Sequence, residues 1–336
     1  MNHYHKALNN YKIVQVSLIK IMINFVKRKI SVVIPVFNEE EVISDTISTL
    51  LKETSTWKYN YELIFINDGS IDRTYDILKD KCALNTNIKV LNLSRNFGHQ
   101  MAFTAGLDIA SGDAVIVIDG DLQDPPHVMK QFITKWENGF HVVYGKRSRR
   151  KGETYFKKLS ARLFYQLLDV LSETNIPRDT GDFRLMDRCV VEKLKTMREK
   201  HRFIRGMVSW VGFKQTSVIY ERDQRPAGKT KYPFKKMMTF ALDGIFSFST
   251  VPIKISLFVG FLTILVSFFG ILLALINRLL TNGWVSGWTT LIITILFLGG
   301  VQLISIGVLG QYIGRTFEQI KDRPLYIIQD TTNLDE

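Results

Sequence analysis

Two long uncharged apolar runs in the C-terminal part limit what this chain can fold into. The first covers residues 255–276 and the second residues 289–313, and neither contains Asp, Glu, Lys or Arg. About 20 consecutive apolar residues are enough for a helix to cross the hydrocarbon core of a bilayer. The sequence therefore predicts a membrane protein with two transmembrane helices.

The distribution of basic residues predicts how these helices are oriented. Lys and Arg are dense before the first run and follow the second at Arg315, Lys321 and Arg323, whereas the connecting loop contains only Arg278. By the positive-inside rule, both termini and the domain before the first run are expected in the cytoplasm. Lipid headgroups and phosphates also explain the net charge of +12, and no nucleic-acid-binding module or nucleic-acid partner is expected.

The rest of the chain divides into segments of different character. The apolar patches before Ile30 are broken by Lys20 and Asn24, so this part is expected to be a peripheral extension and not a signal peptide. Cys82 and Cys189 have no paired spacing, which argues against a disulfide framework or a zinc site. The predicted divisions are an extension (1–29), a catalytic domain (30–232), an aromatic-rich interfacial helix (233–253), a transmembrane domain (254–314) and a C-terminal tail (315–336).

Short apolar strands alternate with helical segments in the first half of the chain. The predicted strands cover residues 30–37, 61–66, 88–93 and 115–118. This alternation is typical of an α/β domain with a mostly parallel sheet, in which ligands bind beyond the carboxyl ends of the strands. Polar residues follow all four of these ends, namely Glu39, Asp68, Arg95, Asp119 and Asp121.

The last of these strand ends predicts a metal site. If the backbone stays extended past Ile118, then Asp119, Asp121 and Gln123 project to the same side, because strand side chains alternate. Oxygen ligands of this kind suit Mg²⁺ or Mn²⁺. A solvated acidic turn is the alternative, but the agreement of four strand ends favours a site. The chain has neither G-x-G-x-x-G nor a Walker lysine loop, so a metal and arginines would hold a diphosphate here.

The middle of the chain adds basic and acidic candidates. A strand over residues 142–147 ends in a basic cluster, and residues 155–171 have the period of an amphipathic helix, for which core packing and contact with a membrane surface are the alternatives. The segment 179–184 follows a proline and contains a glycine, which predicts a loop over the site that carries Asp182.

Four motifs in fixed order carry a resemblance to a known family. They are Val33–Glu39, Asn67–Ser70, Asp119–Pro125 and Thr180–Arg184. Together they resemble the family 2 glycosyltransferases, which have the Rossmann-like GT-A fold, and within them the polyprenyl-phosphate sugar transferases such as dolichyl-phosphate mannose synthase and the bactoprenol glucosyltransferases. The resemblance extends from about Ser31 to the C-terminus.

The resemblance implies roles for the candidate residues. Pro35, Glu39, Asp68 and Arg95 would frame the nucleotide, with Asp68 suited to accept the N3–H of uracil, and Asp119 and Asp121 would bind the donor. Asp119, Asp121 and Gln123 would hold the metal, and Asp182 would act with Asp121 in catalysis or in positioning the acceptor. The basic residues implied for the acceptor phosphate are Arg147, Arg162, Arg202, Arg205, Arg225, Lys229 and Lys231.

The reaction implied is an inverting transfer of a hexose from a nucleotide sugar, either UDP-glucose or UDP-N-acetylglucosamine, to undecaprenyl phosphate at the cytoplasmic membrane face. The product would serve cell-envelope glycan modification, with Mg²⁺ or Mn²⁺ as cofactor. Implied partners are the bilayer, further copies of the chain in a homo-oligomer such as a tetramer, and a flippase or downstream glycosyltransferase. The alternatives are a processive polysaccharide synthase, disfavoured by the two spans and the lack of Gln-x-x-Arg-Trp, and a silent membrane scaffold.

Overall fold

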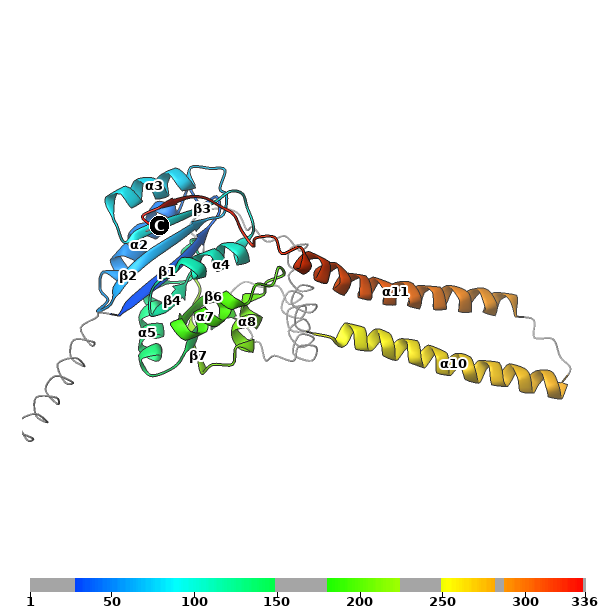
Figure 1. Ribbon diagram of the computed structural model, residues 1–336. Coiled ribbons are helices and arrows are strands. Elements are labelled where there is room, and N and C mark those ends of the chain that lie inside the picture. Colours follow the sequence, from blue (N-terminus) through cyan, green and yellow to red (C-terminus); the bar gives the residue numbers. More distant parts are fainter. Residues whose placement is uncertain (1–27, 149–179, 224–248, 282–286, 335–336) are drawn as a thin grey trace, which may run out of the picture.

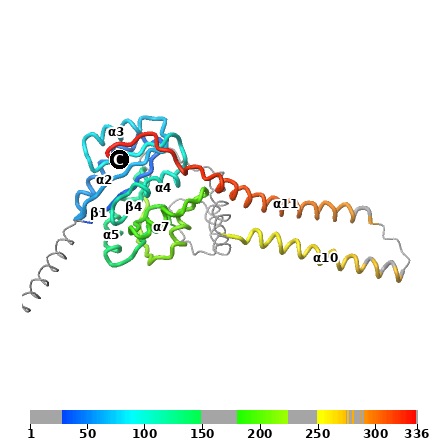
Figure 2. Tube along the Cα trace, in the orientation of Figure 1, coloured from blue at the N-terminus to red at the C-terminus, as the bar shows by residue number. Residues whose placement is uncertain are grey.

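The computed structural model describes residues 28–148, 180–223, 249–281 and 287–334. These residues form an α/β domain from which a pair of long helices extends, as Figures 1 and 2 show. The N-terminal extension, the predicted amphipathic helix at 155–171 and most of the predicted interfacial helix lie outside the described residues.

The predicted alternation of strands and helices is confirmed in the first half of the chain. The elements in chain order are β1 (Lys29–Val36), α2 (Ile43–Thr54), β2 (Asn60–Asn67), α3 (Thr74–Leu84), β3 (Ile88–Leu93), α4 (His99–Ile109) and β4 (Ala114–Val117). These strands consist largely of β-branched and aromatic residues, which favour extended backbone. All four run parallel to one another, with β1 between β2 and β4.

The complete sheet has eight strands in the order β7-β5-β6-β4-β1-β2-β3-β8. The later elements are η1 (Pro126–Val128), α5 (Met129–Glu137), β5 (Val142–Arg147), β6 (Thr180–Asp187), α7 (Arg188–Thr196), α8 (Ile204–Trp210), β7 (Gln215–Tyr220) and β8 (Ile328–Thr332). β6 is antiparallel to both of its neighbours, and β8 is antiparallel to β3. The sheet is therefore mixed but mostly parallel, as predicted.

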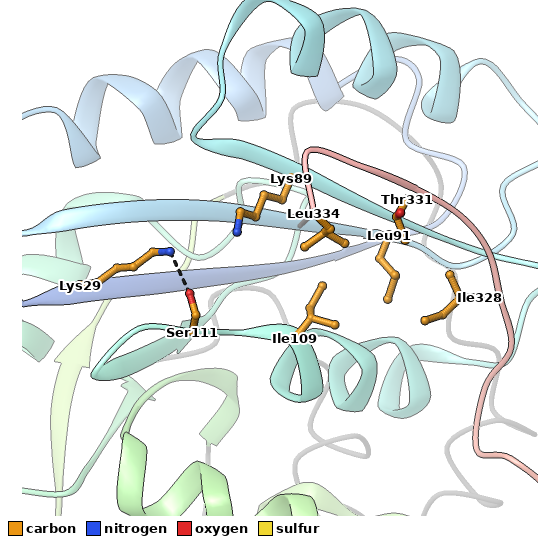
Figure 3. Close-up of a pocket in the computed structure, with 8 residues that line it drawn as sticks. All are labelled: Lys29, Lys89, Leu91, Ile109, Ser111, Ile328, Thr331 and Leu334. Carbon is orange, nitrogen blue, oxygen red and sulfur yellow. Dashed lines mark hydrogen bonds between the residues drawn. The ribbon is translucent and has the colours of Figure 1, made fainter. Parts of the chain in front are cut away.

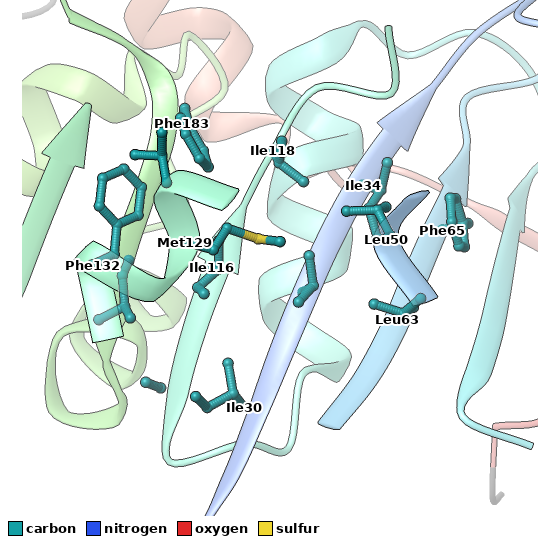
Figure 4. Close-up of a cluster of buried hydrophobic side chains, with 14 of the residues drawn as sticks. Ile30, Ile34, Leu50, Leu63, Phe65, Ile116, Ile118, Met129, Phe132 and Phe183 are labelled. Carbon is teal, nitrogen blue, oxygen red and sulfur yellow. The ribbon is translucent and has the colours of Figure 1, made fainter. Parts of the chain in front are cut away.

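Helices cover both faces of the sheet and produce two apolar cores. Alternate residues of β1, such as Ile30 and Ile34, pack with α2, α3 and α5 on one face (Figure 4). Val33 points to the other face, where α4, α7 and α8 contribute the apolar side chains. Both faces of the central strands are buried, which explains their nearly continuous apolar sequence.

The expectation of a loop at residues 179–184 is wrong for the described part of that segment. Thr180–Asp187 is a strand that pairs with β4 on one side and with β5 on the other. The preceding proline and the glycine suggested a loop, but pairing on both sides makes this segment a strand, and its buried Asp182 and Arg184 have hydrogen-bond partners. Arg147 approaches this strand closely, since a Cβ on Gly181 would lie 2.8 Å from its Nη2 and would require that side chain to move.

Two long apolar helices follow the α/β domain, and both are long and apolar enough to cross a membrane. They are α10 (Val251–Thr281) and α11 (Trp288–Ile320), and the candidate spans within them are Val251–Leu273 and Thr290–Ile320. The Tyr312 hydroxyl donates to the Ser249 carbonyl at 2.6 Å and joins the end of α11 to the start of α10.

The predicted C-terminal tail returns to the α/β domain, which the sequence reasoning missed. Its strand β8 pairs antiparallel with β3 at the edge of the sheet. The Tyr326 hydroxyl donates to Asp108 on α4 at 2.8 Å, and Tyr75 on α3 donates to Asp330. The segment also closes one side of a hollow, which Figure 3 shows lined by Lys29, Lys89, Leu91, Ile109, Ser111, Ile328, Thr331 and Leu334.

Asn333 fastens the end of this segment, and replacing it with alanine is expected to release β8 locally. Its side-chain amide donates to the carbonyls of Cys82 and Ile88, both at 2.9 Å, and each bond contributes about 1 kcal/mol. Amide exchange of residues 328–334 in the full-length protein should become faster in Asn333→Ala. The exposed Asn87 supplies the control, because Asn87→Ala should leave exchange unchanged. Equal exchange in both variants would contradict the prediction.

Candidate active site

The candidate site lies where β1, β2, β3 and β4 end at one edge of the sheet. The chain proceeds from β1 outward to β2 and β3, then returns to place β4 on the other side of β1. Such a reversal opens a crevice between the two central strands, and ligands of α/β proteins bind there. Pro35 lies near the end of β1, Glu39 follows that strand, and Asp119 follows β4.

The loops after β1 and β2 are tied together on the predicted nucleotide side. The backbone N–H of Asn38 donates to Ser70 Oγ at 2.9 Å, and Asn38 Oδ1 accepts from the N–H of Ile71 at 2.9 Å. The N–H of Glu39 donates to Thr74 Oγ1 at 2.8 Å. Pro35 is buried within β1 beside Ile66. These bonds position Glu39 at the end of its strand, close to the start of α3.

Asp68 organises the loop that leads from β3 to α4. Its two carboxylate oxygens accept the N–H groups of Phe97 at 2.7 Å and Gly98 at 3.0 Å. Burial raises the pKa of Asp68, and these two N–H groups partly oppose that shift. In the same loop, the Arg95 guanidinium lies 4.0 Å from the centre of the Phe97 ring. Arg95 thus belongs to a loop that Asp68 holds, and the role of both residues at the nucleotide stays a prediction.

Gly69 allows this close approach, and Gly69→Ala is expected to cost at least about 2 kcal/mol of stability. Its φ is 66°, and a Cβ would lie 2.3 Å from the backbone carbon of Arg95. Gly139 is the matched control, since its φ is 84° but nothing lies within 4 Å of its Cβ position. Comparing the thermal unfolding of the two alanine variants separates the steric clash with Arg95, present only at Gly69, from the cost of a positive φ, which both positions share. Equal losses in the two variants would show that the close contact is unimportant.

The acidic end of β4 turns instead of continuing as a strand, so the expected extended row is wrong. β4 ends at Val117, and Leu122 has a φ of 56° in the left-handed region. Asp121 Oδ1 accepts the N–H of Gln123 at 3.1 Å, which closes a local turn. The Gln123 carbonyl accepts the N–H of Asp223 at 3.0 Å and joins this turn to the end of β7.

Negative charge accumulates around Asp119. Burial raises the pKa of Asp119 to about 6, and the charges of Asp124, Asp182 and Asp121 add to this shift. One oxygen of the fully buried Asp124, Oδ2, has no hydrogen-bond partner among the residues that the structure describes. Within the described residues, no three His, Cys, Asp or Glu side chains form a metal site by themselves. The acidic residues nevertheless fit a divalent cation, which would offset this charge while a diphosphate completed its ligand shell.

Asp182 lies in a network of hydrogen-bond donors. Arg205 Nε donates to its Oδ1 at 2.9 Å, and His99 Nε2 lies 3.2 Å from its Oδ2. Gln100 Nε2 donates to Oδ2 at 3.3 Å. Burial opposes ionisation of Asp182, but Arg205 and His99 outweigh it and hold the pKa of Asp182 well below its usual range. A carboxylate with this pKa is a hydrogen-bond acceptor and not a proton-accepting base at neutral pH.

His99 joins Asp182 to the acidic end of β4. Its Nε2 also lies 3.6 Å from Asp119 Oδ1. Burial opposes protonation of the imidazole, but the hydrogen bond to Asp182 and the charges of Asp119 and Asp182 raise the pKa of His99 to about 9. The ends of β4 and β6 are therefore connected through the first residue of α4.

A second buried carboxylate, Asp124, gathers arginines from the ends of β5 and β7. The Tyr220 hydroxyl donates to Asp124 Oδ1 at 2.5 Å. Arg147 Nη2 and Arg222 Nε lie 3.7 Å and 3.6 Å from the same oxygen. Burial opposes protonation of Arg147, but Asp124 and Tyr220 outweigh it and raise its pKa. Two cations are thus fixed beside the acidic turn.

The predicted basic residues fall into three groups. Arg147 and Arg205 lie in the networks of Asp124 and Asp182. Arg202 is buried elsewhere, where its Nη1 donates to the Met197 carbonyl and burial lowers its pKa. Four others lie outside the described residues, namely Arg162, Arg225, Lys229 and Lys231.

Sequence reasoning missed several members of these networks. His99 and Gln100 begin α4, directly after the polar loop that follows β3, and this location beside a strand end was a signal that the sequence offered. Asp124 belongs to the acidic motif, but nothing in the sequence indicated that it would be buried beneath two arginines. Arg184, in the fourth motif, is also buried, and its Nη2 donates to the Gly181 carbonyl at 2.9 Å.

Comparison with known proteins defines the class to which this fold and site belong. Residues 31–195 match the family model described as "Glycosyl transferase family 2". An uncharacterised glycosyltransferase of Bacillus subtilis is 48% identical over 91% of this chain and 94% of its own length. The protein is a glycosyltransferase. It belongs to glycosyl transferase family 2, as the four motifs predicted.

Other relatives have names that include an acceptor. A prophage bactoprenol glucosyl transferase homolog of Escherichia coli is 44% identical over 90% of this chain and 98% of its own length. The bactoprenol glucosyl transferase of Shigella phage SfII is 44% identical over 90% of this chain and 97% of its own. A solved structure similar to this chain is mannosyl-3-phosphoglycerate synthase from Rubrobacter xylanophilus, at 16% identity, a TM-score of 0.46, and coverage of 64% of this chain and 71% of that one.

Proposed function

We propose that this glycosyltransferase moves a hexose from a UDP-sugar, either UDP-glucose or UDP-N-acetylglucosamine, to undecaprenyl phosphate on the cytoplasmic face of the membrane. The observation that carries the proposal is the combination of an acidic strand end, two arginine-bearing networks and two apolar helices in one chain. Relatives at 44% identity are named bactoprenol glucosyl transferases. This supports a polyprenyl phosphate as the acceptor.

The donor would bind in the crevice between β1 and β4. Pro35, Glu39, Asp68 and Arg95 would surround the base and ribose, and Asp119, Asp121 and Gln123 would hold Mg²⁺ or Mn²⁺ together with the diphosphate. The metal, when bound, would stabilise the charge that develops on the departing diphosphate. The turn at Asp121 and the charge around Asp119 support this assignment.

The acceptor requires cations more than it requires a base. A phosphate monoester has a second pKa of about 6, so it is already an oxyanion near neutral pH. Arg147 and Arg205, with Arg222 beside them, would hold this phosphate in line with the anomeric carbon, and Asp182 would orient Arg205. A single displacement by the phosphate oxygen then inverts the anomeric configuration. The low pKa of Asp182 supports a reaction without general-base catalysis by this residue.

The position at the membrane is supported by the chain's own connectivity. The residues before α10 and those after α11 both belong to one sheet, through β1–β7 and β8. Basic residues on both flanks favour the cytoplasmic side.

We also propose that the protein acts as a homo-oligomer and passes its product to a flippase or a downstream glycosyltransferase.

A labelled-sugar assay tests the proposal directly. The full-length protein, reconstituted in lipid, is incubated with undecaprenyl phosphate, Mg²⁺ or Mn²⁺, and each of four radiolabelled donors: UDP-glucose, UDP-N-acetylglucosamine, UDP-galactose and GDP-mannose. We expect label in the lipid fraction with one of the first two donors, and none when undecaprenol replaces the phosphate. Lipid label with none of the donors would refute the proposed acceptor. Retention of activity after chelation would refute the metal.

A further inference from the structure

We propose that His99 is a positioning residue for sugar transfer, which holds the Asp182 carboxylate, and through it Arg205, in register with Asp119. The inference rests on the proposed function, because it assigns a task to His99 within that reaction. His99 belongs to none of the four sequence motifs.

The backbone around His99 is built to place its side chain. Gly98 precedes it with a φ of 97°, and the Gly98 N–H is held at 3.0 Å by Asp68 on the predicted nucleotide side. α4 begins at His99, so the imidazole projects from the first position of a helix whose start is fixed by Asp68. The location of His99 therefore depends on the end of β2, the strand end that carries Asp68.

The imidazole nitrogen Nε2 lies between two carboxylates from adjacent strands. It is 3.2 Å from Asp182 Oδ2 on β6 and 3.6 Å from Asp119 Oδ1 beyond β4. β4 and β6 are antiparallel neighbours, with Val117 opposite Arg184, so these two acids come from paired strands. A single N–H donor at this point restrains both side chains, and its shorter contact is to Asp182.

The next residue extends the same connection to α8. Gln100 donates to Asp182 Oδ2 at 3.3 Å, and its side-chain carbonyl accepts the N–H of Ile204 at 3.1 Å. Ile204 is the first residue of α8, which also carries Arg205. The first two residues of α4 thus hold Asp182 and the helix that brings Arg205 to it, so the His99 contact forms part of a network that spans three elements.

Among the described residues, loss of the His99 contact would leave Asp182 held by both Arg205 nitrogens, Nε at 2.9 Å and Nη2 at 3.3 Å, and by Gln100, with Arg184 Nη2 4.0 Å away. None of these remaining groups lies beside Asp119, so the carboxylate and the Arg205 guanidinium would shift together relative to the end of β4. Displacement of a substrate-binding group by about 1 Å can lower a rate by 10²-fold. We therefore expect replacement of His99 to lower kcat and to raise the KM for the lipid acceptor. The KM for the nucleotide sugar should change less.

The test compares His99→Ala with His99→Gln in the full-length, lipid-reconstituted protein. Glutamine retains an N–H donor near the position of Nε2, whereas alanine retains none. We expect His99→Ala to lower kcat at least tenfold and to raise the acceptor KM, with the donor KM within threefold of wild type. His99→Gln should recover most of the lost kcat. His127→Ala, at an exposed histidine, should behave as wild type.

Several results would overturn the inference. One is a kcat within twofold of wild type in His99→Ala, and another is an equal loss of kcat in the alanine and glutamine variants. A third is a lowered thermal unfolding midpoint in His99→Ala without the change in acceptor KM, because a purely structural role gives that pattern. Failure of the proposed function looks different, since the wild-type protein would then transfer no sugar to the lipid.

Discussion

Asp121→Asn is expected to lower transfer of sugar to the lipid at least about 100-fold while the protein remains folded. Asparagine keeps a side-chain oxygen that can accept the N–H of Gln123, so the turn after β4 should persist. What the substitution removes is one negative charge from the acidic end of β4. If this charge holds a divalent cation and, through it, the donor diphosphate, its loss weakens binding of the donor and slows departure of the diphosphate.

Asp113→Asn is the matched control for this variant. Asp113 lies before β4, at the opposite end of that strand, where its Oδ2 accepts the backbone N–H of Lys29 at 2.8 Å. The same isosteric change there should leave transfer within about twofold of wild type. Initial rates with radiolabelled donor, measured over a range of Mg²⁺ or Mn²⁺ concentrations, decide the comparison. Wild-type activity in Asp121→Asn would remove this residue from the proposed metal and diphosphate site.

Glu62→Gln is expected to destabilise the α/β domain by about 3 kcal/mol, because it breaks a buried ionic network. Glu62 is only 2% exposed, and Lys29 and Lys89 lie 2.7 Å and 3.0 Å from its Oε2. The Ser31 hydroxyl and the Ser111 N–H donate to its Oε1 at 2.5 Å and 2.9 Å. A neutral amide cannot accept all of these bonds, and both lysines would lose their counter-charge.

The pH dependence of stability provides an independent check on Glu62. Burial opposes ionisation, but hydrogen bonds from Lys29, Ser31, Ser111 and Lys89 lower its pKa from 4.5 to about 2. Because the folded pKa is depressed, the stabilisation is fully present above pH 4.5 and is lost as the pH falls toward 2. The thermal unfolding midpoint of wild type should therefore exceed that of Glu62→Gln above pH 4.5, and this difference should disappear as the pH falls toward 2.

Glu192→Gln is a suitable surface control for the Glu62 experiment. Glu192 pairs with Arg188 and Lys195 on α7, but its side chain is 53% exposed. Exposed ion pairs contribute little to stability, so the unfolding midpoint should change little at any pH. A constant gap between wild type and Glu62→Gln across the acidic range would contradict the assigned network.

The fold of the first half was predictable because its signals are local. The apolar strands, the helices between them and the two long uncharged runs each depend on neighbouring residues in the sequence. Polar residues at four strand ends were enough to locate the candidate site, since the geometry of a parallel sheet brings those ends together. The four ordered motifs also predicted the family correctly.

What failed depends on contacts between distant parts of the chain. Residues 179–184 were predicted as a loop because they follow a proline and contain a glycine, yet pairing on both sides makes Thr180–Asp187 a strand. The positive φ of Leu122 was not foreseeable from an apolar residue that normally avoids that region. The position of His99 between two carboxylates required knowledge of the order of β4 and β6 in the sheet.

The edge strand β8 has a consequence for how the protein is made. β3 ends at Leu93, whereas β8 begins at Ile328, after both apolar helices. At 5–20 residues per second, the ribosome needs roughly 10–50 s to synthesise the chain between them, during which the β3 edge lacks its partner. If both helices cross the bilayer, β8 can reach β3 only when the second helix returns the chain to the side of the first seven strands. Completion of the sheet therefore follows membrane insertion, and a chain inserted with a single crossing would retain an unpaired, aggregation-prone edge.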